Sequence, residues 1–323
     1  MREITYIQAV NEALREEMER DPNVFVIGED VGDLGGGFGA TKGLLAQFGP
    51  KRVRPTPISE SGFTGLGVGA AMVGLRPVVE IMYIDFIATA MDQVVNQAAK
   101  MFFMSGNQIS VPMVIRAPYG VGSREAAQHS QSPEAWFVNT PGLKVVMPST
   151  AYDAKGLLKT SIRDNSPVFF IENRMLYFNQ EKVPEGEWLI PLGKAAVKRE
   201  GKDITVVALS AMVPKVIRAA ESLGKEVSVE VIDPRSLVPL DAGTIIASVR
   251  KTGRLLVVHD APVRNGFGAE IVRRVAAEAF DYLDAPPEVL GGLNTPIPFS
   301  PPLEDVCIPQ VADIVAKIKQ MTT

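Results

Sequence analysis

Short apolar segments rich in β-branched residues alternate with amphipathic helical segments along most of this 323-residue chain. Continuous apolar runs are typical of strands buried on both faces of a parallel sheet, and the intervening helices cover those faces. The alternation therefore predicts an α/β fold with parallel sheets. The expected strands are 24–28, 53–55, 77–81, 111–116, 143–148, 167–172, 204–209, 227–232, 254–259 and 286–290, and the expected helices are 5–20, 43–48, 62–73, 88–104, 153–163, 213–223, 242–250, 268–280 and 310–319.

A polar stretch, 178–191, interrupts this alternation and is interpreted as a linker that crosses the surface. The chain length suits two domains of about 150 residues each. The predicted division is a first α/β domain over 1–178, a linker over 179–192 and a second α/β domain over 193–323. Within the first helix, the spacing of the apolar residues places Glu16, Glu17 and Glu19 on the solvent side.

Composition excludes several classes of function. A net charge of -4 gives no electrostatic reason to expect binding of nucleic acid or of an anionic membrane. No apolar run approaches the roughly 18 residues of a transmembrane helix, and the chain opens without a signal-peptide pattern. Cys307 is the single cysteine, so no intramolecular disulfide forms, as in proteins of a reducing compartment. We expect a cytoplasmic protein without a targeting peptide.

Three features with a possible chemical role favour a structural interpretation. The glycine-rich loop 35–39 follows a strand but lacks both G-x-G-x-x-G and a Lys-Ser/Thr ending, and three acids precede it. A mobile loop at a domain or subunit edge is favoured there over a phosphate cradle. His259 ends an apolar strand and is expected to be a structural histidine with its hydrogen bonds satisfied, whereas Cys307 has no partner histidine nearby in sequence and is expected to serve packing. His129 and His259 are the only histidines, which argues against metal chemistry by histidine.

Glu60 and His129 stand out as candidate functional residues. Glu60 lies between a turn set by Pro57 and a run of small residues, 62–74. An acid in this position is either a helix N-terminal charge or a group tuned for proton transfer. His129 lies in a polar loop beside Gln128, Ser130 and Gln131, where a structural and a functional role are both open.

Several strings, in this order and over essentially the whole chain, resemble one family. They are Gly28-Glu29-Asp30-Val31, Thr56-Pro57-Ile58-Ser59-Glu60, Gly74-Leu75-Arg76-Pro77-Val78, 92–100 (DQVVNQAAK), Gln128-His129-Ser130-Gln131, 141–146 (PGLKVV), Asp153-Ala154-Lys155-Gly156-Leu157 and Lys251-Thr252-Gly253-Arg254-Leu255. The family is the β subunit of the thiamine-diphosphate-dependent decarboxylating component of 2-oxo acid dehydrogenase complexes.

The resemblance implies a fold and a set of partners. The first domain is similar to the pyrimidine-binding domain of thiamine enzymes, and the second to the transketolase C-terminal domain. The family works as an α2β2 heterotetramer that passes its acyl group to the lipoamide of a dihydrolipoamide acyltransferase core. Thiamine diphosphate and Mg²⁺ are held mainly by the α subunit, through a Gly-Asp-Gly motif that this chain lacks.

The resemblance also implies roles for individual residues. Glu60 matches the catalytic glutamate that binds N1′ of the aminopyrimidine, and His129 matches a histidine of substrate handling and acyl transfer. Ile58, Met82 and Phe86 match the positions that line the pyrimidine. A structural potassium ion, present in some relatives, is held mostly by backbone oxygens; the matching positions are Met113, Ser161, Ile162, Asp164 and Ser166.

The sequence signals for the substrate are mixed. Met82, 104–106 and 126–131 resemble the pyruvate and acetoin branches, whereas 132–135 is shared with branched-chain relatives. The favoured substrate is pyruvate; acetoin and branched-chain 2-oxo acids stay open. Two other functions are also weighed, a stand-alone transketolase-like enzyme and a non-catalytic scaffold for an acyltransferase core.

Overall fold

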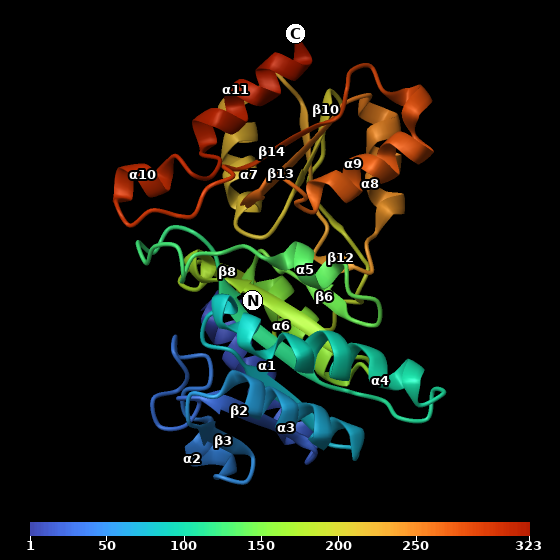
Figure 1. Ribbon diagram of the computed structural model, residues 1–323. Helices are drawn as coiled ribbons and strands as arrows, with labels where there is room; N and C mark the ends of the chain where they lie inside the picture. The colour runs from blue at the N-terminus through green and yellow to red at the C-terminus, as the bar shows by residue number, and fades with distance from the viewer. The chain divides into compact units, whose positions relative to one another are not determined.

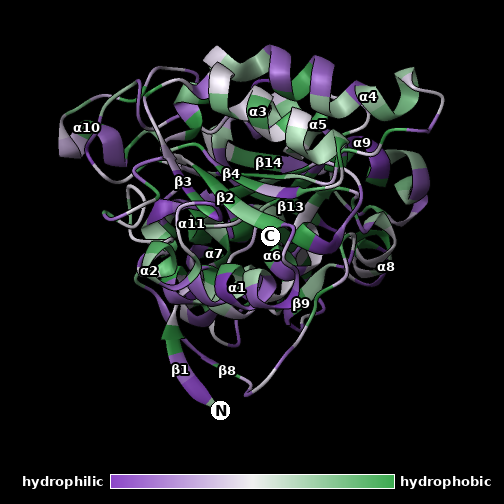
Figure 2. Cartoon of the chain, turned by 90° about the horizontal axis from the view of Figure 1, so that it is seen from below, coloured by the Kyte–Doolittle hydropathy of each residue, from purple (hydrophilic) through white to green (hydrophobic).

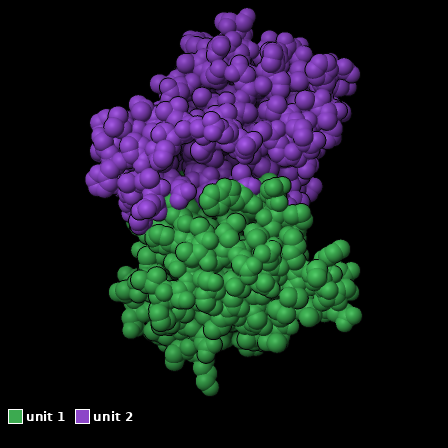
Figure 3. Space-filling view, in the orientation of Figure 1, with its two compact units in different colours: residues 1–119, 136–192 green, residues 120–135, 193–323 purple.

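The computed structural model describes all residues, Met1–Thr323, which form two compact units. The first contains residues 1–119 and 136–192, and the second contains residues 120–135 and 193–323 (Figure 3). None of the helices combines the length and the apolar character that crossing a bilayer requires.

The first unit is built on a parallel sheet. Its strands run in the order β6-β7-β5-β4-β2-β3, and every neighbouring pair is parallel. The strands are largely buried except at the edge strand β3, where two of four residues are exposed, and Figure 2 shows the hydrophobic colour along β2. Their bounds are β2 Val24–Glu29, β3 Val53–Thr56, β4 Arg76–Glu80, β5 Val114–Tyr119, β6 Lys144–Val146 and β7 Val168–Asn173, with an antiparallel pair of β1 Arg2–Thr5 and β8 Gln180–Val183 beside them.

Helices connect these strands (Figure 1). Local capping explains where two of them begin. Thr5 and Gln8 form a capping box at the start of α1, and Thr150 accepts a hydrogen bond from the backbone N–H of Asp153 at the start of α6. The bounds are α1 Tyr6–Arg20, α2 Leu44–Phe48, α3 Glu60–Met72, a 3₁₀ segment Ile84–Ala90, a π-helical segment Gln93–Ala98, α4 Ala99–Met104, α5 Glu134–Val138, α6 Ala151–Arg163 and a 3₁₀ turn Arg174–Leu176.

The second unit contains a five-stranded sheet in the order β14-β13-β10-β11-β9, in which only β9 is antiparallel to its neighbour. Its strands are β9 Ala196–Arg199, β10 Ile204–Ala208, β11 Val229–Asp233, β13 Leu255–Pro262 and β14 Glu288–Gly292, with a short strand β12 Ser236–Val238. Its helices are α7 Met212–Leu223, α8 Ala242–Thr252, α9 Gly268–Glu278, a 3₁₀ turn Phe280–Tyr282, α10 Pro301–Asp305 and α11 Val311–Thr322.

Most predicted elements are present, with differences that have physical causes. Strand β5 begins after Pro112, which has no N–H to donate to a sheet. The stretch predicted as a polar linker forms β8, which pairs with β1. The prediction that Glu17 faces solvent was wrong. Glu17 is fully buried and forms ion pairs with Arg163 and Arg20. The pair with Arg163 joins α1 to α6, against which α1 packs. Polar and apolar residues alternate along α1 in Figure 2.

Candidate active site

Neighbouring strands bring the predicted cofactor residues of the first unit to one edge of its sheet. β2 lies between β3 and β4, with Glu29 opposite Thr56 and Gly28 opposite Glu80. All three strands are parallel, so their carboxyl ends meet at this edge, the usual place for ligands in such sheets. The predicted residues follow at once, with Ile58 and Glu60 after β3 and Met82 and Phe86 after β4.

Glu60 is the first residue of α3, so its carboxylate lies in the first helical turn, where negative charge is favourable. A second acid, Glu29, ends the adjacent strand β2. Burial raises the pKa of Glu29, and the charges of Asp30 and Glu60 raise it further. Two carboxyl groups therefore share this edge. Glu29 was not predicted as a site residue, although its place at the end of an apolar strand was visible in the sequence.

Apolar and aromatic side chains surround the edge. Ile58 is 74% exposed, whereas Met82 and Phe86 are half-buried. The rings of Phe86 and Tyr83 are 5.5 Å apart, and that of Phe38 is 5.4 Å from Tyr83. An exposed isoleucine, a thioether and an aromatic ring next to a carboxylate fit a flat, mostly apolar ring with one basic nitrogen, as in an aminopyrimidine.

The glycine-rich loop packs against this site, contrary to its interpretation as a mobile edge loop. A Cβ on Gly37 would lie 2.9 Å from Cγ of Met82, and Gly36 has a φ of +80° with no room for a side chain beside the Glu80 carboxylate. The Gly37 N–H donates to Glu80, whose pKa is raised by burial and lowered in part by Arg116. Glycine is therefore needed here for close packing.

Glu80, which binds the glycine-rich loop, belongs to a buried ionic network. The Arg116 guanidinium is 1% exposed and lies between Glu80 and Glu172. Its Nε and Nη2 donate to the two Glu172 oxygens at 2.8 and 2.7 Å, and the Tyr177 hydroxyl donates to the same carboxylate at 2.8 Å. Moving Glu80 away from Arg116 would leave a buried charge without its partner, which is energetically costly. The network therefore fixes the position of Glu80.

His129 belongs to the second unit, and Glu60 to the first. The segment that carries His129, residues 120–135, leaves the first unit and returns to it in sequence. His129 is half-buried, and its backbone N–H donates to the carbonyl of Ala126 at 3.4 Å. The structure thus gathers Ile58, Glu60, Met82 and Phe86 within one unit, and His129 belongs to the other.

The predicted potassium ligands lie at the carboxyl end of α6 and at the start of β5 and β7. The carbonyl of Met113 accepts from the Val168 N–H at 2.9 Å, and that of Ser161 from the Asp164 N–H at 3.3 Å. Arg76 Nη1 donates to the carbonyls of Ile162 and Asp164 at 2.9 and 3.0 Å. Lys144 also binds the Asp164 carboxylate, so two side-chain cations, Arg76 and Lys144, already bind oxygen atoms of this predicted site.

His259 and Cys307 lie inside the second unit. His259 is fully buried, its Nδ1 lies 3.0 Å from the Ala261 carbonyl, and burial lowers its pKa to about 4. Its Nε2 has no hydrogen-bond partner, so the ring packs without being fully satisfied. The Cys307 thiol is buried and donates to the Leu303 carbonyl at 3.1 Å, which confirms the packing role.

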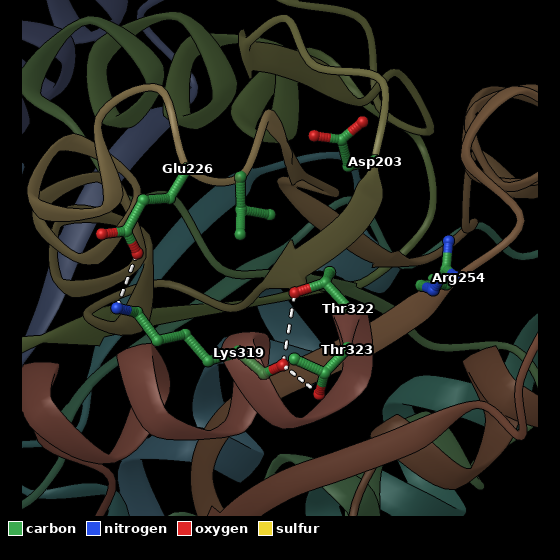
Figure 4. Close-up of a pocket in the computed structure, with 7 residues that line it drawn as sticks. Asp203, Glu226, Arg254, Lys319, Thr322 and Thr323 are labelled. Atoms are coloured by element: carbon green, nitrogen blue, oxygen red, sulfur yellow. Dashed lines mark hydrogen bonds and ion pairs between the residues drawn. The ribbon is translucent and has the colours of Figure 1, made fainter.

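No group of three or more His, Cys, Asp or Glu side chains is placed to hold a metal ion. A cavity of about 360 Å³ opens near the carboxyl terminus of the second unit (Figure 4). It contains none of the predicted site residues, and the Lys319 ammonium on its wall is paired with Glu226 at 2.6 Å. The sheet edge of the first unit is therefore the stronger candidate site.

Comparison with known proteins assigns both parts of the chain to families of domains. The chain matches the family "Transketolase, pyrimidine binding domain" over residues 2–180 and "Transketolase, C-terminal domain" over residues 193–314. It is similar to a split-gene transketolase, an inactive β4 tetramer, with a TM-score of 0.82 and 23% identity over 99% of this chain and 98% of that one. At this identity the likeness shows the fold alone.

Relatives in sequence are closer. The chain is 49% identical to the mitochondrial pyruvate dehydrogenase E1 component subunit beta-2 of Oryza sativa subsp. japonica, over 99% of this chain and 86% of that protein. It is 48% identical to the pyruvate dehydrogenase E1 component subunit beta of Rickettsia felis, over 99% and 98% of the two chains. The corresponding subunit of Rhizobium meliloti is 47% identical, over 99% of this chain and 70% of that one. This chain therefore belongs to the family of β subunits of the thiamine-dependent E1 component of 2-oxo acid dehydrogenase complexes.

Proposed function

We propose that this chain, assembled with an α subunit as an α2β2 heterotetramer, catalyses the oxidative decarboxylation of pyruvate. The acetyl group is passed to the lipoyl group of a dihydrolipoamide acyltransferase core. The names of the similar proteins, which specify pyruvate, support the substrate. The gathering of Glu60 with Ile58, Met82 and Phe86 at one sheet edge is the observation that carries the proposal. We assign the cofactor diphosphate and Mg²⁺ to the α subunit, as the family resemblance implies; this chain has no Gly-Asp-Gly motif.

The residues of this chain hold and orient one end of the cofactor. When bound, thiamine diphosphate supplies a carbon nucleophile and an electron sink for the loss of carbon dioxide. Glu60 holds a proton at N1′ of the aminopyrimidine. Ile58, Met82 and Phe86 cover the faces of the ring and exclude water from this hydrogen bond, which strengthens it.

His129 is assigned to the acyl-transfer half of the reaction. As the acetyl carbon becomes bonded to one lipoyl sulfur, the S–S bond breaks and the other sulfur leaves as a thiolate that takes up a proton. An imidazole ring can both donate and accept a proton, so His129 suits the delivery of this proton. It also orients the substrate carboxylate and carbonyl.

Reconstitution with an α subunit, thiamine diphosphate and Mg²⁺ tests the assignment of Glu60. Glu60→Gln keeps the shape but cannot exchange a proton, so we expect decarboxylation with an artificial electron acceptor to fall by at least about 100-fold. Glu221→Gln, at an exposed position of α7, is the matched control and should keep the wild-type rate. Wild-type turnover by Glu60→Gln in the assembled enzyme would sink the proposal.

The same preparation separates the alternatives. Turnover of pyruvate, acetoin and 3-methyl-2-oxobutanoate, compared at equal concentration, should be highest for pyruvate. Tight thiamine diphosphate binding by the chain without an α subunit would instead favour a stand-alone transketolase-like enzyme. A non-catalytic scaffold would keep full lipoamide acetylation in His129→Ala, whereas we expect a large loss with assembly intact.

A further inference from the structure

The segment that carries His129 has an unfavourable backbone. Gly120 and Gly122 have φ angles of 110° and 126°, and Arg124 and Ala126 have φ angles of 63° and 62°. The last two carry a Cβ, for which the left-handed region is disfavoured. Such a run keeps one conformation only where other contacts hold it, so the contacts of this segment determine where His129 lies.

One buried carboxylate supplies several of those contacts. Glu304, in α10, is fully buried and lies far away in sequence. Its Oε1 accepts from the backbone N–H groups of Gly122 at 2.7 Å and of Arg124 at 3.3 Å. Its Oε2 accepts from Arg124 Nη1 at 2.9 Å. A single side chain thus binds two main-chain donors and the side-chain cation of the same segment.

Further contacts fasten Arg124 to the same helix. Its Nη1 donates to the Pro301 carbonyl at 2.9 Å, and its Nη2 lies 2.8 Å from the exposed carboxylate of Asp305. Unlike Asp305, which pairs with the Arg124 side chain, Glu304 also accepts hydrogen bonds from the main chain of the segment. Charge-assisted bonds of this kind are stronger than neutral ones, and a buried partner is not screened by solvent.

Movement at Gly122 and Arg124 is passed on to His129. Arg124 is followed by Glu125 and Ala126, and the Ala126 carbonyl accepts from the His129 N–H at 3.4 Å. A change in the left-handed angles at Arg124 or Ala126 would therefore displace the imidazole.

We propose that Glu304 is a positioning residue for His129, which it acts on by binding the backbone of Gly122 and Arg124. This inference rests on the proposed role of His129 in acyl transfer. Glu304 itself does not touch the substrate, and its effect is confined to the step that needs the imidazole. The prediction is thus a selective loss of acetylation, with decarboxylation at Glu60 largely kept.

The test uses the assembled E1 component with free lipoamide and, separately, with an artificial electron acceptor. Glu304→Gln removes the charge from the carboxylate, and we expect acetylation of lipoamide to fall about 10- to 100-fold, as for other displaced catalytic groups. Asp305→Asn is the matched control, because it removes a partner of Arg124 without touching the main chain. It should transfer within about twofold of wild type, since exposed ion pairs contribute little.

A double variant distinguishes positioning from a general loss of stability. If Glu304 acts through His129, Glu304→Gln with His129→Ala transfers no more slowly than His129→Ala alone. Losses that multiply, or a wild-type rate in Glu304→Gln, overturn the inference. Glu304→Asp keeps the charge and should recover part of the rate, which covers the case in which Glu304→Gln does not fold. Failure of the wild-type enzyme to turn over any 2-oxo acid would overturn the proposed function, and with it this inference. The results for the Glu304 variants bear on the inference only.

Discussion

The surroundings of Glu134 differ from those of an ordinary surface acid. It is 1% exposed, and neither carboxylate oxygen has a hydrogen-bond partner in another residue. Burial, followed by the charge of Asp260, raises its pKa to about 8. The folded protein therefore binds a proton that the unfolded chain releases near pH 4.5, so this contribution to stability is full below that pH and is lost as pH rises to about 8. The total is on the order of 4 kcal/mol.

We expect Glu134→Gln to melt at a higher temperature than wild type at pH 8.5. The glutamine side chain is neutral at every pH, whereas the wild-type carboxylate must either be buried with its charge or take up a proton on folding. Near pH 5 the two should differ little. Circular dichroism melts at a series of pH values measure this, with Glu221→Gln as a variant at an exposed site. A difference in melting temperature that does not depend on pH would contradict the raised pKa.

Glu60 and His129 could be singled out from sequence because their signal is local, in the flanking proline, glycines and polar neighbours. The sequence shows that Glu29 ends an apolar strand, but its place beside Glu60 follows only from the adjacency of β2 and β3. Glu304 depends on main-chain donors far away in sequence, and no local pattern reports them. Burial without a partner, as at Glu134, is likewise a property of the fold alone.

Elements with local signals were predicted most accurately. Helices α1 and α6 begin where Thr5 and Thr150 cap them. The helix expected over 88–104 instead contains a π-helical segment, Gln93–Ala98. The wider turn lets Asp92 accept from Gln97 at 3.3 Å as well as from Asn96 at 2.7 Å. Such insertions depend on tertiary packing, and hydrophobic spacing does not reveal them. The pairing of β8 with β1 is also non-local, so 178–191 read as a linker.

The carboxyl end of α6 provides a prediction about potassium. We propose that K⁺ binds the free lone pairs of the carbonyl oxygens of Met113, Ser161, Ile162, Asp164 and Ser166, a ligand type that suits this ion. Binding to the folded state alone would raise the melting temperature by about 3 °C in KCl relative to NaCl at equal ionic strength. Equal melting temperatures in the two salts would instead mean that K⁺ does not bind here, because Arg76 and Lys144 already bind the oxygen atoms of this site.

At the scale of the whole molecule, the two families of similar domains match 2–180 and 193–314, close to the predicted division at 178 and 193. The compact units divide the chain differently, because 120–135 belongs with the second unit. A change in composition marks where one domain ends in sequence. Composition does not reveal that the segment 120–135 packs with the second unit and that the chain then continues in the first. The contacts that hold this segment, such as its hydrogen bonds to Glu304, join residues far apart in sequence.

Helix α3, which begins at Glu60, presents an unusual outer face. Gly62, Leu66, Gly69 and Val73 recur at helical spacing and are all exposed, Leu66 at 47% and Val73 at 80%. A Cβ on Gly69 would meet nothing within 4 Å in this chain. Small and apolar residues without a partner on the helix of Glu60 suit close packing against another subunit. We expect the α subunit to cover this face.

Gly69→Ala separates the stability of the chain from that of the assembly. Alanine in place of an exposed helical glycine stabilises by roughly 0.5–1 kcal/mol, so the purified chain should melt at a slightly higher temperature. Its added methyl group would fill the space that a closely packed α subunit needs, and we expect association to weaken at least about tenfold in analytical ultracentrifugation. Gly243→Ala, at an exposed position in α8, is the matched control and should stabilise the chain without affecting assembly. If both variants assemble as wild type does, the α subunit does not pack on this face of α3, and Glu60 must reach the cofactor from a different subunit boundary.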